Sequence, residues 1–181
     1  SVGIAAAVAI NLVDLTNEAF ISGTSIVEAT GGDVRAQMKS DGAFDTDSAG
    51  THKIYAKATS GAGTPDGDVG IAGAFAMNLF DDTTSAKIKT GADVDAGGGA
   101  VNVLAGSTTA VTAIATSDAG GDVGIGASVA LNILDTNDTV AEVENSAALT
   151  SAGNVTVQAT ADHAITTTTE AGAAGGRVAI A

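Results

Sequence analysis

The chain has 181 residues, a formal net charge of −14 and no cysteine. Its 7 Lys and Arg against 21 Asp and Glu cannot form the basic face that nucleic acid requires, and the lack of Cys excludes a disulfide framework and a thiolate metal site. Hydrophobic residues make up 45% of the chain but aromatic residues only 3%, which predicts a folded protein with few large side chains to fill a thick core.

The opening segment, residues 2–12, alternates between larger apolar and small side chains. Val8, Ile10 and Leu12 occupy one parity, and Ala7 and Ala9 occupy the other. This period of two predicts a β-strand. We expect the larger side chains to pack inward, and the small face to be approached by a second layer or a neighbouring chain.

The same segment returns along the chain, which is the strongest signal in the sequence. A Val-Gly-Ile triplet or its close variant begins at residues 2, 69, 123 and 178, and nine residues after each of the first three valines stands an asparagine: Asn11, Asn78 and Asn132. We therefore treat residues 1–181 as one repetitive unit with repeats at about 2–68, 69–122 and 123–177. The first repeat is longer, and we place its extra residues within 40–53.

Further short strands are expected in each repeat, and no helix. The segments with strand-like patterns are residues 54–59, 109–116, 139–143, 154–160 and 164–169. Stretches rich in Gly and Asp separate them and predict turns. Each repeat would then hold about four short strands.

These features predict an all-β fold, a parallel β-solenoid (β-helix) built from about three 54-residue repeats. Stacked units bury a thin, continuous core that one unit alone cannot form. Two coils of about 27 residues or three of about 18 both fit one repeat. We expect Asn11, Asn78 and Asn132 to form a structural ladder at a corner of the coil. An antiparallel β-sandwich is the alternative fold.

The repeat resembles those of very large bacterial surface proteins, the filamentous-haemagglutinin-like adhesins and leukotoxin-type repetitive exoproteins. The matching segments are residues 121–135 and 153–159. The chain departs from this pattern in its long first repeat and in the variants Lys87 and Glu142 of the second strand. The resemblance implies secretion, an extracellular location at the bacterial cell surface, and a role in adhesion or as a stalk.

Paired carboxylates are the main candidates for chemistry. Alternate Asp residues in a Gly-rich loop can ligate Ca²⁺, and Asp66 and Asp68 are the first pair that we assign to such a metal site; solvated turn residues are the competing interpretation. Similar pairs stand at 45 and 47, 81 and 82, and 93 and 95. Gly124-Ile125-Gly126 resembles the start of a dinucleotide-binding motif, but it lies within a predicted strand and is interpreted as structural.

We expect no catalytic residues and no organic cofactor. His52 and His163 share no repeat position in this reading, and no nucleophile motif accompanies them. The expected function is that of a structural, adhesive segment acting as a rigid rod or filament-forming module. A Ca²⁺-dependent binding module or a polysaccharide-active β-helix enzyme is the alternative.

The expected partners are other copies of the chain, the rest of a longer chain, and a host or neighbouring cell surface. Nucleic acid is not expected as a partner, because the net charge is −14. Membrane insertion is not expected either, because no apolar run reaches about 18 residues. The chain opens without Met and stops within the repeating pattern, so we interpret it as a fragment of a longer protein.

Overall fold

The computed structural model describes residues 1–37, 51–63 and 69–181, and within these ranges the protein is all-β. No helix occurs there, and hence none long and apolar enough to cross a bilayer. The strands are β1 (Val2–Ile21), β2 (Ile26–Glu28), β3 (Gly32–Gln37), β4 (His52–Ala62), β5 (Val69–Ile88), β6 (Asp93–Asp95), β7 (Val101–Val143), β8 (Ala148–Thr150) and β9 (Val155–Ile180).

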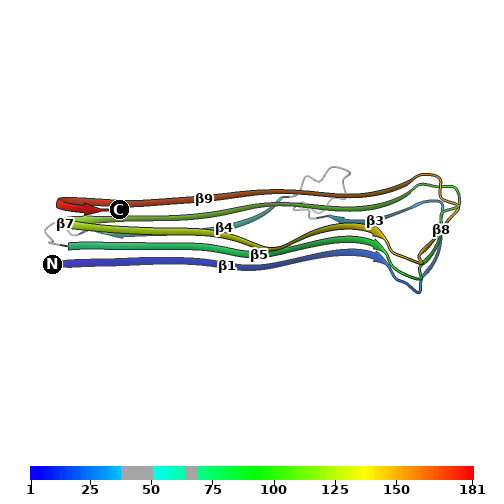
Figure 1. The fold of residues 1–181 in the computed structure, drawn as a ribbon, viewed down its shortest axis with the longest axis horizontal. Coiled ribbons are helices and arrows are strands. Elements are labelled where there is room, and N and C mark those ends of the chain that lie inside the picture. Colours follow the sequence, from blue (N-terminus) through cyan, green and yellow to red (C-terminus); the bar gives the residue numbers. More distant parts are fainter. Residues whose placement is uncertain (38–50, 64–68) are drawn as a thin grey trace.

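Each repeat forms one long, flat coil. A long strand runs the length of the molecule, a three-residue strand crosses the far end, and the chain then runs back, so that both termini lie at the same end (Figure 1). β7 supplies two such passes: residues 101–121 run back and residues 123–143 run out again, with the reversal at Gly121, whose φ is 143°. The expectation of two or three coils per repeat is therefore wrong.

Neighbouring coils pair in parallel and in register. Val2 pairs with Val69 and Val69 with Val123, and the other pairings of the described strands are also parallel. This arrangement confirms the parallel solenoid and is incompatible with the antiparallel sandwich. We call β1, β5 and residues 123–143 the outgoing sheet, and β3, β4 and residues 101–121 and 155–175 the return sheet.

The strands are fewer and longer than predicted. β1 and β5 each span 20 residues and β7 spans 43, where four short strands per repeat were expected. The Gly- and Asp-rich stretch at residues 118–122 does contain a reversal, at Gly121. Within each pass, however, backbones rich in Gly and Ala stay extended despite their low intrinsic strand propensity, because the neighbouring coils pair with them.

The small side chains, and not the large ones, form the core between the two sheets. Ala76 is 0% exposed, whereas Ile4 is 75% and Leu12 71% exposed on the outer surface of the outgoing sheet. Alternation defines two faces of a strand but not which one is inside. In the part of the coil near the termini the inward face holds only small residues, and the sheets approach closely there: a Cβ on Gly70 would lie 2.0 Å from the carbonyl oxygen of Gly120.

The core changes in character along the coil. Towards the termini it consists of alanines, among them Ala74, Ala76 and Ala113. Near the middle Phe80 and Val111 fill it. At the far end Val, Ile and Ala from all three coils pack together under the small sheet β2-β6-β8. The extra residues of the first repeat fall between Gln37, which pairs with Gly106, and His52, which pairs with Thr109.

Candidate interaction surfaces and interior polar groups

The three landmark asparagines stack inside the core and bond to one another. Asn11 Nδ2 donates to Asn78 Oδ1 at 2.9 Å, and Asn78 Nδ2 donates to Asn132 Oδ1 at 2.7 Å. Each amide also donates across to a carbonyl oxygen of the return sheet: Asn11 to Tyr55, Asn78 to Thr112 and Asn132 to Thr166. Asn78 is 0% exposed.

This ladder lies in the middle of the outgoing strands and not at a corner of the coil, where the sequence had suggested it. Its three acceptor residues in the return sheet are themselves register partners. The amides therefore tie neighbouring coils together and also tie the two sheets together. If one strand slid along its neighbour, these bonds would break and buried amides and carbonyls would be left without partners.

A second polar group in the interior surrounds Asp82. Its carboxylate is 0% exposed and accepts hydrogen bonds from Ser107 Oγ and from Thr109 Oγ1, the latter at 3.2 Å, while Thr84 Oγ1 lies 3.5 Å away. The hydroxyl donors come from both sheets. The cluster satisfies a buried carboxylate within the closed core, so its evident role is structural.

The two histidines occupy one register position, contrary to the sequence interpretation. His52 pairs with Thr109 and Thr109 with His163, so the three residues follow one another across the coils. The insertion in the first repeat hid this relation, because it shifts His52 along the chain but not in the stack. Neither ring nitrogen of His163 has a hydrogen-bond partner among the described residues.

The outer surface of the outgoing sheet carries a broad apolar face. On every coil, five outward positions hold aliphatic or aromatic side chains or Met, without an interspersed charge. Even in the third coil Val129 is 46% exposed. The apolar face consists of Val2, Ile4, Val8, Ile10 and Leu12; Val69, Ile71, Phe75, Met77 and Leu79; and Val123, Ile125, Val129, Leu131 and Ile133.

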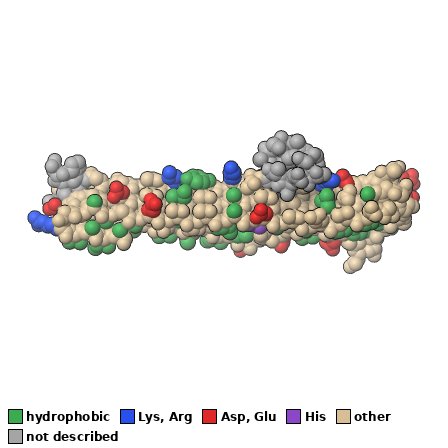
Figure 2. All heavy atoms as spheres, turned by 90° about the horizontal axis from the view of Figure 1, so that it is seen from above, with side chains coloured by type: hydrophobic (Ala, Val, Ile, Leu, Met, Phe, Trp, Pro, Cys, Tyr) green, Lys and Arg blue, Asp and Glu red, His purple; other side chains and the backbone are tan. Residues whose placement is uncertain are grey.

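Other parts of the outer surface are polar. Beyond Leu12 the outgoing sheet presents Asp14, Thr16 and Glu18, and the return sheet presents mainly Thr, such as Thr112 and Thr166. In the view of Figure 2, charged side chains are spread singly along the molecule, while hydrophobic ones gather along the lower margin. Near the termini, the outer surface of the outgoing sheet is therefore apolar and that of the return sheet is polar.

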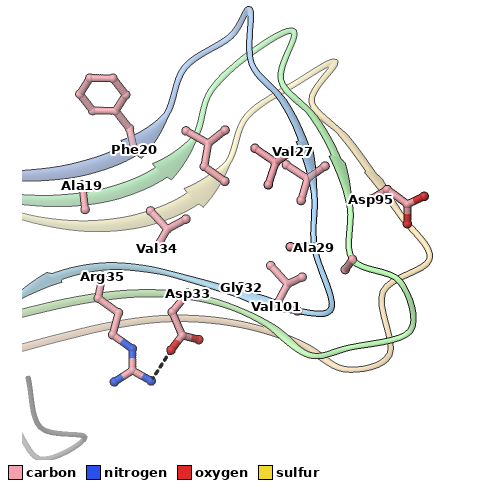
Figure 3. Close-up of a pocket in the computed structure, with 14 residues that line it drawn as sticks. Ala19, Phe20, Val27, Ala29, Gly32, Asp33, Val34, Arg35, Asp95 and Val101 are labelled. Atoms are coloured by element: carbon pink, nitrogen blue, oxygen red, sulfur yellow. Dashed lines mark ion pairs between the residues drawn. The ribbon is translucent and has the colours of Figure 1, made fainter.

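The first coil leaves the end of the core open. A hollow of about 680 Å³ lies where β1, β2 and β3 meet, and Val27 and Val34 point into it (Figure 3). Beside it Arg35 and Asp33 form an ion pair at 3.1 Å. β1 ends the order of its sheet, and β9 pairs with β7 alone among the described strands. As far as the described strands go, both ends of the stack thus present an open strand edge.

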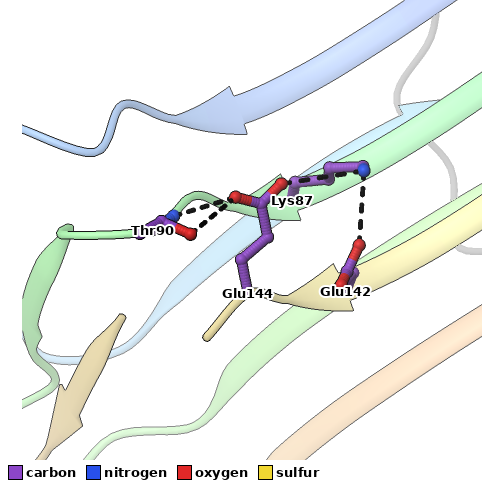
Figure 4. Close-up of polar contacts among 4 residues, drawn as sticks. All are labelled: Lys87, Thr90, Glu142 and Glu144. Atoms are coloured by element: carbon purple, nitrogen blue, oxygen red, sulfur yellow. Dashed lines mark hydrogen bonds and ion pairs between the residues drawn. The ribbon is translucent and has the colours of Figure 1, made fainter. Parts of the chain in front are cut away.

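An ion-pair cluster joins the second and third coils near the far end. Lys87 Nζ lies 3.2 Å from Glu142 Oε2 and 3.7 Å from Glu144 Oε1 (Figure 4). The hydrogen bond to Glu142 is the main reason that the pKa of Lys87 is raised. Glu144 accepts the backbone N–H of Thr90 at 2.9 Å, and this bond is the main reason that its pKa is lowered.

The predicted calcium ligands Asp66 and Asp68 lie outside the described residues, as do Asp45 and Asp47. The remaining two pairs are described. Asp81 and Asp82 are neighbours on a strand and point to opposite faces, so they cannot share one ion. Asp93 and Asp95 are exposed, and Asp95 accepts the Gly97 N–H, which lowers its pKa. Within the described ranges no three His, Asp or Glu side chains converge.

The Gly-x-Gly segment at 124–126 has a packing role. A Cβ on Gly126 would lie 2.3 Å from the carbonyl oxygen of Gly172, and one on Gly124 would lie 2.8 Å from that of Ala119. The return strand passes too close for any side chain. No helix follows this segment, and a helix is what a dinucleotide site needs.

Comparison with known proteins adds no relative: no family model, curated protein or solved structure matches this chain.

Proposed function

We propose that the chain is a structural, adhesive segment of a larger secreted protein at a bacterial cell surface, in which similar coils stack in register into a rigid rod. The observation that carries the proposal is the register: Val stands over Val and Asn over Asn through three coils. Such an array grows by repetition, since each coil provides the template for the next.

The ends of the stack support the same role. The hollow at the first coil and the edges of β1 and β9 are surfaces that a further coil would cover. In an isolated domain a long exposed edge strand promotes aggregation. In a solenoid that continues, the same edge pairs with the next coil. Rigidity follows from the ladder, because Asn78 bonds to both neighbouring coils and to the opposite sheet.

The experiment adds one coil. A second copy of residues 69–122 is inserted after residue 122, so that the valine and asparagine positions stay in register. We expect one more layer, with the stack about 4.8 Å longer by small-angle scattering and a higher urea midpoint. The matched control inserts the same residues with one residue deleted after Gly70, which turns every later side chain of that strand to the other face.

An added repeat that stays unprotected in amide hydrogen exchange, or a shifted insert that stabilises equally, would overturn the stacking role. The surface location is tested on cells that produce the full protein. Protease added outside intact cells should remove the segment; protection equal to that of a cytoplasmic marker would count against secretion.

A further inference from the structure

We propose that the apolar face is the contact through which two copies of this chain pair, face to face. The inference goes beyond the rod function, because it concerns the side of the stack and not its ends. Nine of the fifteen side chains that define this face are between 37% and 75% exposed, and they lie next to one another over three neighbouring strands. Isolated exposed apolar side chains are ordinary on a monomer, but a contiguous exposed apolar patch marks an interaction site.

The pattern of sizes on this face fits a second copy. Between the columns that begin with Ile4 and Val8 runs a column of small residues: Ala6, Gly73 and Ala127. When two copies meet with their strands antiparallel and their stacking axes parallel, this small column lies opposite the partner's column of Val8, Phe75 and Val129.

The middle coil provides the clearest correspondence. It carries the largest outward side chain, Phe75, and also the smallest residue in the small column, Gly73. In the outer coils the same two columns hold Val and Ala. In the antiparallel arrangement Phe75 of each copy therefore meets the groove that Gly73 leaves in the other, and the interface is self-complementary, as a two-fold contact must be.

Charge selects the same arrangement. The column next to the apolar face begins with Asp14 and Asp81. With parallel strands these carboxylates would lie opposite those of the partner, and the like charges would repel. With antiparallel strands Leu12 lies opposite the partner's Val2, so these carboxylates project past the end of the partner's strand and do not meet its carboxylates. An anionic lipid surface is a poor occupant for the same reason, since the border of the face is acidic.

The test measures mass in solution by light scattering after size exclusion, for the whole chain at tens of micromolar. We expect a dimer. Val8→Lys with Leu12→Lys, two residues that are 68% and 71% exposed, should give a monomer with an unchanged circular dichroism spectrum, because dimerisation would bury four unpaired ammonium groups. The control is Ala164→Lys with Thr168→Lys, at the same spacing on the outer surface of β9, which should stay dimeric.

The arrangement itself is tested with cysteines, since the chain has none. A mixture of Ala6→Cys and Val8→Cys chains should be joined by a short bismaleimide cross-linker, because sheets packed face to face lie ~10 Å apart, too far for a direct disulfide. Val2→Cys chains alone should not be joined. A monomeric wild-type chain, a dimer that survives the two lysines, or binding to neutral phosphatidylcholine vesicles in place of pairing would overturn the proposal. These outcomes leave the inserted-repeat experiment untouched, so the two proposals fail separately.

Discussion

Lys87 and Glu142, the two residues that depart from the repeat pattern, are partners on neighbouring coils, with Nζ and Oε2 3.2 Å apart. Each departure compensates the other: a cation in the second coil stands beside an anion in the third. Because stacking places equivalent positions side by side, a charge at one repeat position is tolerated when the next coil carries its opposite.

A charge swap tests this pairing. Lys87→Glu should lower the free energy of unfolding by about 1 kcal/mol, because three carboxylates then meet at a partly exposed site. Adding Glu142→Lys should restore most of the loss. Urea unfolding of both single variants and the double variant measures the coupling, and purely additive losses would contradict it.

The same cluster predicts how stability depends on pH. The pKa of Glu144 is lowered in the folded protein, so its contribution is present above the unfolded pKa and is lost as pH falls through the folded value. The pKa of Lys87 is raised from 10.5, so its contribution is complete below that value and is lost as pH rises through the folded one. Urea midpoints across the pH range measure both losses. In Lys87→Met the alkaline loss should disappear, whereas the acid loss should persist, because the Thr90 N–H is the main cause of the lowered pKa of Glu144.

Removing the central amide of the ladder should be costly. Asn78→Ala leaves the buried carbonyl of Thr112 and the amides of both neighbouring coils without their partner, and we expect a loss of about 3 kcal/mol. Asn11→Ala, at the end of the ladder, should cost about 1 kcal/mol. Equal losses in urea unfolding would show that the asparagines act singly and not as a ladder.

Two glycines of β5 allow a controlled test of how closely the two sheets approach each other. A Cβ on Gly70 would lie 2.0 Å from the carbonyl oxygen of Gly120, whereas one on Gly73 meets nothing closer than 4.0 Å. Gly70→Ala should destabilise by about 2 kcal/mol through overpacking. Gly73→Ala should be neutral or stabilise by about 0.5 kcal/mol. A tolerated Gly70→Ala would mean that the sheets lie farther apart.

Two turn residues at the far end are strained. Ser146 and Ser151 have φ of 64° and 52°, a region that costs a residue with a side chain about 1 kcal/mol. Gly91, which bonds to Ser146 through its N–H, has φ of 84° at the preceding coil. Ser146→Gly should therefore raise the unfolding temperature, and Ala147→Gly next to it should lower it. A decrease in both would rule out the strain.

Calcium dependence remains a prediction that the described residues do not address. A rod held by its own core and ladder should unfold at the same temperature in CaCl₂ and in EDTA. A rise with Ca²⁺ that disappears in Asp66→Asn with Asp68→Asn would instead establish the metal-dependent module. Asp93→Asn with Asp95→Asn serves as the control, because those carboxylates are exposed on β6.

The sequence by itself determined the fold class and the stacking partners. Repetition of Val and Asn at fixed intervals leads to coils in register, because identical layers bury identical faces. It also indicated the turns at the far end, where Gly97 and Gly98 have positive φ. These are properties of local pattern and spacing, and they need no knowledge of the third dimension.

Only the tertiary structure decided which face of the strand is inside, how many coils a repeat makes, and that His52 and His163 share a position. Alternation is symmetric between two faces, so the choice depends on the distance between the sheets. The cross-sheet bonds of Asn78 and the contact at Gly70 set that distance. A core as thin as one alanine layer then leaves the larger side chains of residues 2–12 on the outer surface.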